Sequence, residues 1–120
     1  MRSSAFTQRN YWAVVPFGLE EVASKLASSL GLWDYEIREE DTDCWIEGWL
    51  PDRTSVYVCR DRKCTLPLRF IITPPPSDIA NFGRRLAKCL GIQVSHGDVS
   101  YLGEEKFVFS EESRFDPKNA

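Results

Sequence analysis

Residues 70–94 predict a strand, a proline turn, a helix and a second strand, and this order constrains the whole fold. The apolar, mostly β-branched run 70–73 favours a strand, and the three prolines that follow it cannot continue a sheet ladder. Apolar side chains then recur at helical spacing up to Gly91, a position at which glycine commonly ends a helix. We expect Ser77 to be the N-cap, with Asp78 in the first turn near the positive end of the helix dipole.

The same pattern occurs 60 residues earlier in the chain. Residues 11–15 predict a strand, Pro16 stops it, and apolar residues at helical spacing run from Leu19 to the closing Gly31. A shift of 60 residues places Gly31 on Gly91. The similarity fits an internal duplication, and it also fits two unrelated helices that each end in a leucine and a glycine. Either origin predicts two strand–helix–strand units.

Strand-rich segments separate and follow these two units. Alternation of apolar and polar side chains predicts strands at residues 33–39, 44–50, 54–60 and 65–73. On the first of these strands, the alternation places Trp33, Tyr35 and Ile37 on one face. After the second helix we expect a short strand at residues 92–95, a turn at 96–98 and a last strand at 106–109.

Strands grouped between segregated helices indicate an α+β fold. We expect a two-layer sandwich, ferredoxin-like in character, in which two helices pack on one face of a mainly antiparallel sheet. The opposite face of the sheet would then be open to solvent or to a partner. Residues 1–120 would form a single domain, large enough to bury a core without disulfide staples, with residues 1–9 and 111–120 as flexible tails.

The apolar runs of the chain are all shorter than the roughly 20 residues that span a bilayer. The first residues also lack the apolar core of a secretory signal, so we expect a cytoplasmic protein with no membrane partner. In that compartment the four cysteines would stay reduced. The spacing between Cys59 and Cys64 differs from that of a zinc knuckle, and we expect no metal and no cofactor.

No motif in the sequence indicates catalysis. The turns before the two helices are rich in proline and lack the glycine-rich loop that cradles a phosphate. There is no G-x-S-x-G nucleophile elbow, and no cysteine stands next to a histidine. We expect His96 to be an exposed turn residue; the alternative, a general base acting with Asp98, lacks a residue that would orient the imidazole. The sequence therefore predicts a binding protein rather than an enzyme.

Acidic residues concentrate between positions 36 and 47, where Arg38 is the only basic residue. Three interpretations are open: a solvated hairpin tip, a metal site, or a partner-binding face on which tryptophans alternate with acids. A calcium loop is disfavoured, because Asp41-x-Asp43 lacks the following glycine and the closing glutamate. The period alone does not tell whether the tryptophans or the intervening apolar side chains face the core. The candidate partner-binding residues are Glu36, Glu39, Glu40, Asp41, Asp43, Trp45, Glu47 and Trp49.

Basic residues cluster at positions 60–63 and 84–88, and aromatic side chains near such clusters can stack on the bases of single strands. The net charge of −3 and the lack of an RRM-type aromatic motif argue against that function, so we expect no nucleic-acid partner. A negative net charge instead permits a basic protein partner.

Residues 82–109, with the sequence FGRRLAKCLGIQVSHGDVSYLGEEKFVF, resemble the end of small immunity proteins from bacterial polymorphic-toxin systems. In that pattern, a helix with leucine–alanine pairs and a small cap precedes a short strand, an acidic turn and a final strand. The match covers about a quarter of the chain. The resemblance implies a non-enzymatic, cytoplasmic inhibitor in a bacterium, which occludes the active surface of a cognate toxin such as a basic nuclease domain.

The alternative function is a small-molecule-binding regulatory domain of α+β fold, with its pocket between the helices and the sheet. A third function, an enzyme that uses His96 and Asp98, would require the loss of an identified activity when His96 is replaced. The sequence leaves open the identity and activity of the partner, the strand order, the sheet face that is free and the oligomeric state.

Overall fold

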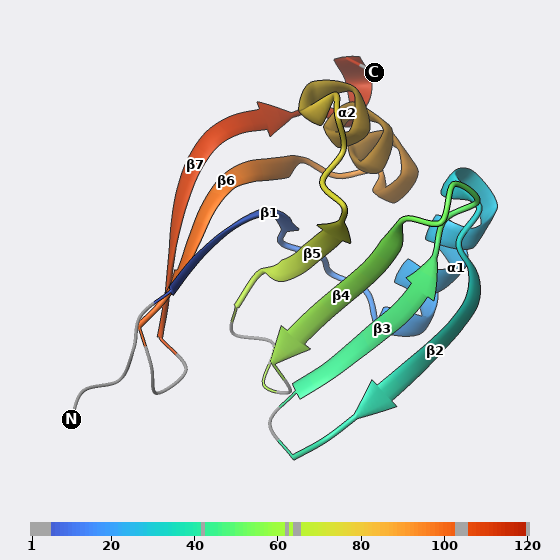
Figure 1. Ribbon diagram of the computed structural model, residues 1–120, viewed down its shortest axis with the longest axis horizontal. Helices are drawn as coiled ribbons and strands as arrows, with labels where there is room; N and C mark the ends of the chain where they lie inside the picture. The colour runs from blue at the N-terminus through green and yellow to red at the C-terminus, as the bar shows by residue number, and fades with distance from the viewer. Residues whose placement is uncertain (1–5, 42, 62, 64–65, 103–105, 120) are drawn as a thin grey trace.

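The computed structural model describes residues 6–41, 43–61, 63, 66–102 and 106–119 (Figure 1). The elements in chain order are β1 (Phe6–Ala13), α1 (Leu19–Leu30), β2 (Trp33–Glu39), β3 (Asp43–Trp49), β4 (Ser55–Asp61), β5 (Leu68–Thr73), α2 (Ile79–Leu90), β6 (Val94–Tyr101), β7 (Phe107–Phe115) and the short 3-10 helix η1 (Pro117–Asn119). The seven strands form one sheet in the order β2-β3-β4-β5-β1-β6-β7, and all neighbours in it are antiparallel. The fold is α+β, as the sequence predicts.

The sheet is larger than the two predicted strand–helix–strand units would make. α1 connects β1 to β2, and α2 connects β5 to β6, with β1 lying between β5 and β6. The strands β3, β4 and β7 belong to neither unit. Each of them follows its predecessor within a few residues, and so short a connection returns the chain only as an antiparallel neighbour. β3 and β4 therefore lie between β2 and β5, and β7 extends the sheet beyond β6.

Both helices lie where the sequence predicts them, and both end at the predicted glycines. Gly31 and Gly91 adopt left-handed backbone conformations with φ of 80° and 72°, which glycine tolerates without strain. The N-cap of α2 is Asp78 rather than the predicted Ser77, and its carboxylate accepts a hydrogen bond of 3.0 Å from the backbone N–H of Asn81. Serine and aspartate are both good N-caps, so adjacent candidates are not separable by residue type. Neither described helix is long and apolar enough to cross a membrane.

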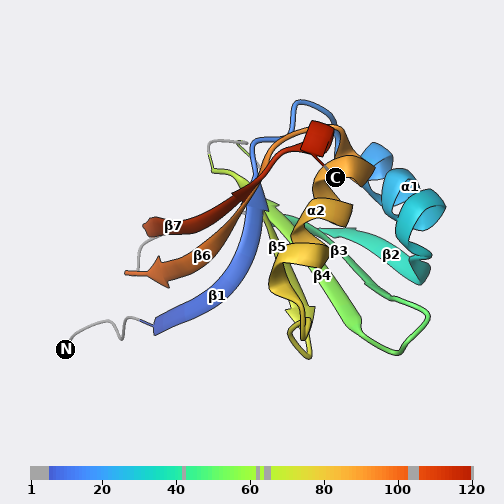
Figure 2. The same cartoon turned by 90° about the horizontal axis from the view of Figure 1, so that it is seen from above.

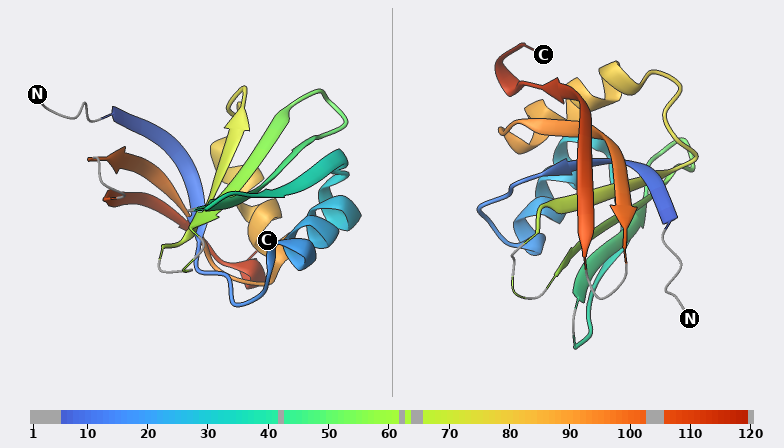
Figure 3. Two further views of the ribbon diagram at one scale, coloured as in Figure 1. Left: turned by 90° about the horizontal axis from the view of Figure 1, so that it is seen from below. Right: turned by 90° about the vertical axis from the view of Figure 1, so that its left-hand side faces the viewer.

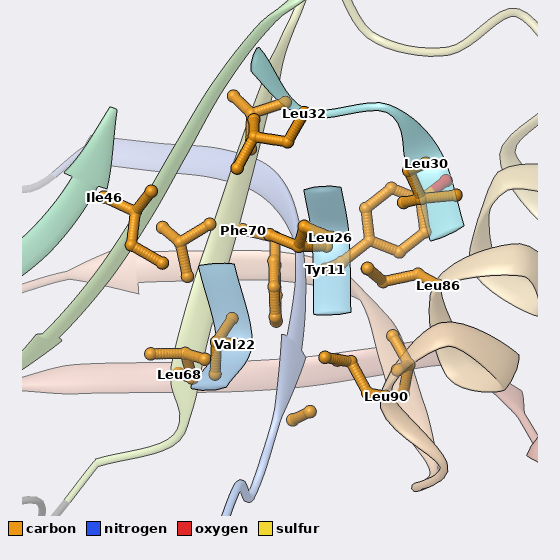
Figure 4. Close-up of a cluster of buried hydrophobic side chains, with 14 of the residues drawn as sticks. Tyr11, Val22, Leu26, Leu30, Leu32, Ile46, Leu68, Phe70, Leu86 and Leu90 are labelled. Atoms are coloured by element: carbon orange, nitrogen blue, oxygen red, sulfur yellow. The ribbon is translucent and has the colours of Figure 1, made fainter. Parts of the chain in front are cut away.

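The core lies between the helices and one side of the sheet (Figures 2 and 4). Leu26 of α1 and Leu86 of α2 join Tyr11 and Phe70, from the central strands β1 and β5, in one buried cluster. The hydroxyl group of Tyr11 donates a hydrogen bond of 2.7 Å to the carbonyl oxygen of Ile79, in the first turn of α2. This bond satisfies the one polar group of the ring and ties α2 to the central strand.

The space between the helices and the sheet is filled. Its residual void, lined by Leu26, Phe70 and Leu86 among others, measures about 10 Å³. A void of that size has room for at most one water molecule. This void is too small for the ligand of the small-molecule alternative.

Both predicted tails contain strand residues. β1 begins at Phe6 and β7 continues to Phe115, so residues 6–9 and 111–115 are paired in the sheet, whereas residues 1–5 and 120 lie outside the described part of the chain. Both segments pair with β6, and an ion pair also joins them: the guanidinium of Arg9 binds the carboxylate of Glu112 at 2.6 Å. Polar composition here reflects pairing across the sheet rather than a free end.

The predicted turn at residues 96–98 is also wrong. β6 runs without a break from Val94 to Tyr101. At a β-bulge, His96 pairs with Ser113 and Gly97 with Glu111, which leaves Glu112 of β7 as the extra residue. The side chain of Asp98 points toward β1, where it binds Arg9 at 3.0 Å. A histidine, a glycine and an aspartate in a row usually indicate a turn, but here each has a place in the sheet.

We expect Gly83→Ala to destabilise the fold, because a Cβ atom at this position in α2 would meet the ring of Phe115, including its Cζ atom at 2.8 Å. The overpacking should cost about 1–3 kcal/mol, although alanine favours a helix over glycine by about 1 kcal/mol. Urea unfolding followed by circular dichroism measures this. In a Phe115→Leu background, which removes the ring, the same substitution should cost less; an equal cost in both backgrounds would contradict the explanation.

Candidate functional site

The predicted partner-binding residues lie together at one edge of the sheet. β2 is the edge strand, and all seven of its side chains are exposed. We call the following seven exposed residues of this region the acidic edge: Trp33, Glu36, Glu39, Glu40, Asp41, Glu47 and Trp49. Asp43, the remaining predicted acid, is half-buried at the start of β3 and belongs to the groove described below.

The structure decides which face of β3 carries the tryptophans. Ile46 is fully buried in the core, so Trp45 and Trp49 project to the opposite, helix-free face. Trp49 is 43% exposed, which suits a contact residue. Trp45 is half-buried against the ring of Tyr57, with 6.2 Å between centroids, and is a weaker candidate for direct contact.

Trp33 is a candidate contact residue that the sequence did not single out. It is the cross-strand partner of Trp49 and is 53% exposed, while its indole N–H donates to the carbonyl oxygen of Leu50 at 3.3 Å. The register of β2 shifts between Trp33 and Glu36, so these two residues share the helix-free face. The predicted alternation put Trp33 on the face of Ile37. Strict alternation assumes an unbroken strand, so it does not reveal the β-bulge that moves Trp33 to the other face.

The charges of the acidic edge are partly compensated. Glu36 and Glu47 are cross-strand partners, and Arg38 binds both, at 2.9 Å and 3.2 Å. Like charges on opposite strands repel, so the arginine makes this pairing possible. All three side chains are about half exposed, and such pairs contribute roughly 0–1 kcal/mol to stability. Arg38 thus offsets part of the charge of Glu36 and Glu47, in a stretch where residues 36–47 hold six acidic side chains and one basic side chain.

The helix-free face carries a second feature, a row of side chains that crosses the sheet. The strand register aligns Arg38, Trp45, Cys59, Arg69, Trp12, Ser95 and Arg114. We call this alignment the transverse row. Its outer arginines are neutralised, Arg38 by the two glutamates above and Arg114 by Glu111 at 2.9 Å. The central arginine, Arg69, has no such partner among the described residues.

A groove of about 490 Å³ opens on the helix-free face beside Arg69. The two halves of the sheet diverge there: β1, β6 and β7 extend to one side and β3, β4 and β5 to the other (Figure 3). Phe6, Tyr101 and Phe107 come from the first half, and Tyr57 and Arg69 from the second. These side chains come from five different strands, and the pairing of the strands brings them together. The groove therefore has no local motif in the sequence.

Two of the groups near Arg69, the Cys59 thiol and the Tyr57 hydroxyl group, stay protonated at neutral pH. Burial raises the pKa of Cys59, whose thiol therefore stays protonated and is a poor nucleophile. Burial, with nearby acidic groups, likewise raises the pKa of Tyr57, so its hydroxyl group remains a hydrogen-bond donor. The groove thus combines the cation of Arg69, neutral polar groups and aromatic rings with the carboxylates of Asp43 and Asp61.

A second cleft, of about 520 Å³, opens at the rim of the helix layer. The proline turn 74–76 forms one wall, with Leu30, Phe82 and Arg85 on the others. This cleft is the nearest counterpart to the predicted pocket between the helices and the sheet, and it lies outside the filled interior.

His96 is not the exposed turn residue that the sequence predicts. Its side chain is 3% exposed and packs against the ring of Tyr11, with 4.5 Å between centroids. Burial, and then the nearby charge of Arg9, lower its pKa, because both disfavour the imidazolium. No three His, Cys, Asp or Glu side chains in the described part of the chain are grouped to hold a metal ion. Cys64 lies outside that part.

Comparison of the chain with known protein families, with curated proteins and with solved structures finds no match.

The buried histidine predicts a loss of stability in acid. The pKa of His96 is lowered in the folded state, so the unfolded chain binds the proton first as the pH falls below about 6.5. Proton binding by the unfolded chain favours unfolding. Above that pH, the titration of His96 does not change the stability. We expect His96→Phe, which keeps a ring against Tyr11, to lose less stability than the wild type between about pH 7.5 and about pH 5. Urea titrations of both proteins at the two pH values measure the difference. Equal losses would show that His96 titrates alike in both states.

Proposed function

We propose that the chain is a non-enzymatic protein-binding inhibitor, which uses the acidic edge to occlude a basic surface of a partner protein. The observation that carries this proposal is an edge strand exposed along its whole length, with two exposed tryptophans beside several carboxylates. The resemblance to immunity proteins suggests the partner: a bacterial toxin domain, such as a nuclease, whose substrate-binding surface is basic. The proposal takes the molecule as a cytoplasmic protein of two layers, with the helices on one face and the other face free.

The outer side of β2 supports recognition of a protein strand. An edge strand presents backbone N–H and C=O groups along its free side, and a partner strand can add there. Charged side chains on an edge also discourage aggregation, which is the simpler explanation of the acids. That explanation does not account for Trp33 on β2 and Trp49 on the neighbouring strand β3, since exposed indoles favour association.

The residues of the acidic edge would have two roles. Trp49 and Trp33 form a cross-strand pair of exposed rings, and such aromatic anchors dominate binding energy when a partner covers them. Glu39, Glu40 and Asp41 lie at the exposed tip of the β2–β3 hairpin. Charges at the rim of an interface mainly accelerate association with an oppositely charged partner.

Reversing charges on the acidic edge should weaken binding of a toxin domain encoded beside the gene of this chain. We expect Glu36→Lys/Glu39→Lys to reduce the affinity about tenfold or more, and to reduce its dependence on salt, as measured by isothermal calorimetry. The control is Glu20→Lys/Glu21→Lys on exposed positions of α1, which makes the same change in net charge. An equal effect of both pairs would assign the binding to bulk charge, and absence of binding by the wild type would contradict the proposed function.

Removing the exposed indole of Trp49 should affect binding without affecting folding. We expect Trp49→Ala to weaken binding of the same toxin domain by about 2 kcal/mol, as for an aromatic anchor, while the urea midpoint changes little. The matched control is Val108→Ala, because Val108 is similarly exposed, at 47%, on the opposite edge strand β7. Unchanged affinity in the Trp49 variant would remove this residue from the interface.

A further inference from the structure

We propose that the groove on the helix-free face is a binding site for a small organic anion with a flat apolar body, held by the guanidinium of Arg69. This site is separate from the acidic edge and does not depend on the proposed function. The argument for it begins with the unpaired charge of Arg69.

Arg69 is half-buried, and its Nε–H is buried without a hydrogen-bond partner. Its guanidinium lies over the ring of Phe107, with Cζ at 4.2 Å from the ring centroid, and this contact holds the side chain in place. The guanidinium of Arg69 has no hydrogen bond or ion pair within the described residues. A buried donor on a charged group without an acceptor is unfavourable, and its position at a groove points to an acceptor that arrives with a ligand.

The fork of donors on a guanidinium matches a carboxylate, sulfonate or phosphate group, which can accept two parallel hydrogen bonds. The other arginines of the transverse row show the contrast: Arg38 and Arg114 each bind glutamates of this chain. Arg69 is therefore the arginine of the row whose anionic partner the described chain does not supply.

The walls of the groove define the rest of the ligand. Phe6, Tyr101 and Phe107 form a chain of ring contacts, with centroids 5.4 Å and 5.3 Å apart. Phe6 is 51% exposed, so a ligand that covers its ring removes apolar surface from water. Tyr57 lines the other half of the groove. Aromatic walls favour a flat apolar body, and about 490 Å³ is a typical volume for a small-molecule site.

The surrounding charges favour one anionic group over a polyanion. A nucleic-acid strand needs several free cations for its phosphates, and two of the three arginines of the row are occupied by glutamates. Asp43 and Asp61, which are cross-strand partners, line the groove as well. Their carboxylates would repel a second negative group, so the charge of the ligand belongs at Arg69 and its uncharged body along the rings.

The test uses 8-anilino-1-naphthalenesulfonate, a flat aromatic anion that fluoresces in apolar sites, and the neutral N-phenyl-1-naphthylamine, which lacks the sulfonate. We expect the folded protein to bind the sulfonate probe at a single saturable site. Arg69→Met keeps an unbranched apolar stem and removes the guanidinium with its charge, and it should weaken that binding about tenfold or more. The neutral probe should bind the wild type and the variant alike.

The control is Arg85→Met, because Arg85 lines the second cleft, at the rim of the helix layer. It should leave the affinity for the sulfonate probe unchanged. Equal affinity in the wild type and Arg69→Met, or equal loss in both variants, would overturn the proposal. Near-ultraviolet circular dichroism establishes that each variant keeps its tertiary packing, because partly unfolded states also bind the probe.

A second measurement needs no variant. In the ¹⁵N-labelled wild type, the Nε–H signal of Arg69 should shift on addition of the sulfonate probe and saturate with the same affinity as the fluorescence. The Nε–H signal of Arg85 serves as the internal control and should stay in place. A probe that saturates the fluorescence without moving the Arg69 signal would place the binding elsewhere and overturn the proposal.

Discussion

The fold depends on the burial of Tyr11 at the centre of the sheet. Its ring contacts Phe82 of α2, His96 of β6 and Phe115 of β7, and its hydroxyl group binds the first turn of α2. Burial raises the pKa of Tyr11, so the hydroxyl group stays protonated and keeps donating. One residue of β1 thus contacts the second helix and both strands that follow it.

Alternation along the strands places successive side chains on opposite faces of the sheet. Residues that face Tyr11 are used for the core, and residues on the other face of the same strands are left with few partners. On β5, Phe70 is buried in the core, whereas its neighbour Arg69 lies in the groove. On β3, Ile46 likewise lies in the core, whereas its neighbour Trp45 lies on the other face against Tyr57. Both proposed sites therefore lie on surfaces that the helices leave uncovered.

The sequence predicts what depends on local pattern and misses what depends on pairing. The helices ending at Gly31 and Gly91 have strong local signals, and the strands of the meander alternate clearly. Arg9 and Glu112 look like residues of polar tails, because their partnership spans most of the chain. For the sites, the acids of the edge are visible in the sequence, but Trp33 requires a bulge to be known. Arg69 could not be found, since an unpaired arginine is recognised only when its neighbours across the strands are known.

The central place of β1 also has a consequence for how the chain acquires its structure. β1 precedes all the other strands, yet Tyr11 pairs with Phe70 and Phe6 pairs with Tyr101. During synthesis, β1 has no strand to pair with until β5 has been made, whereas the strands β2–β5 can already pair as adjacent hairpins. β1 is paired on both sides only when β5 and β6 have both been made. A chain organised in this way is expected to fold slowly for its length, because its central pairings are the most distant in sequence.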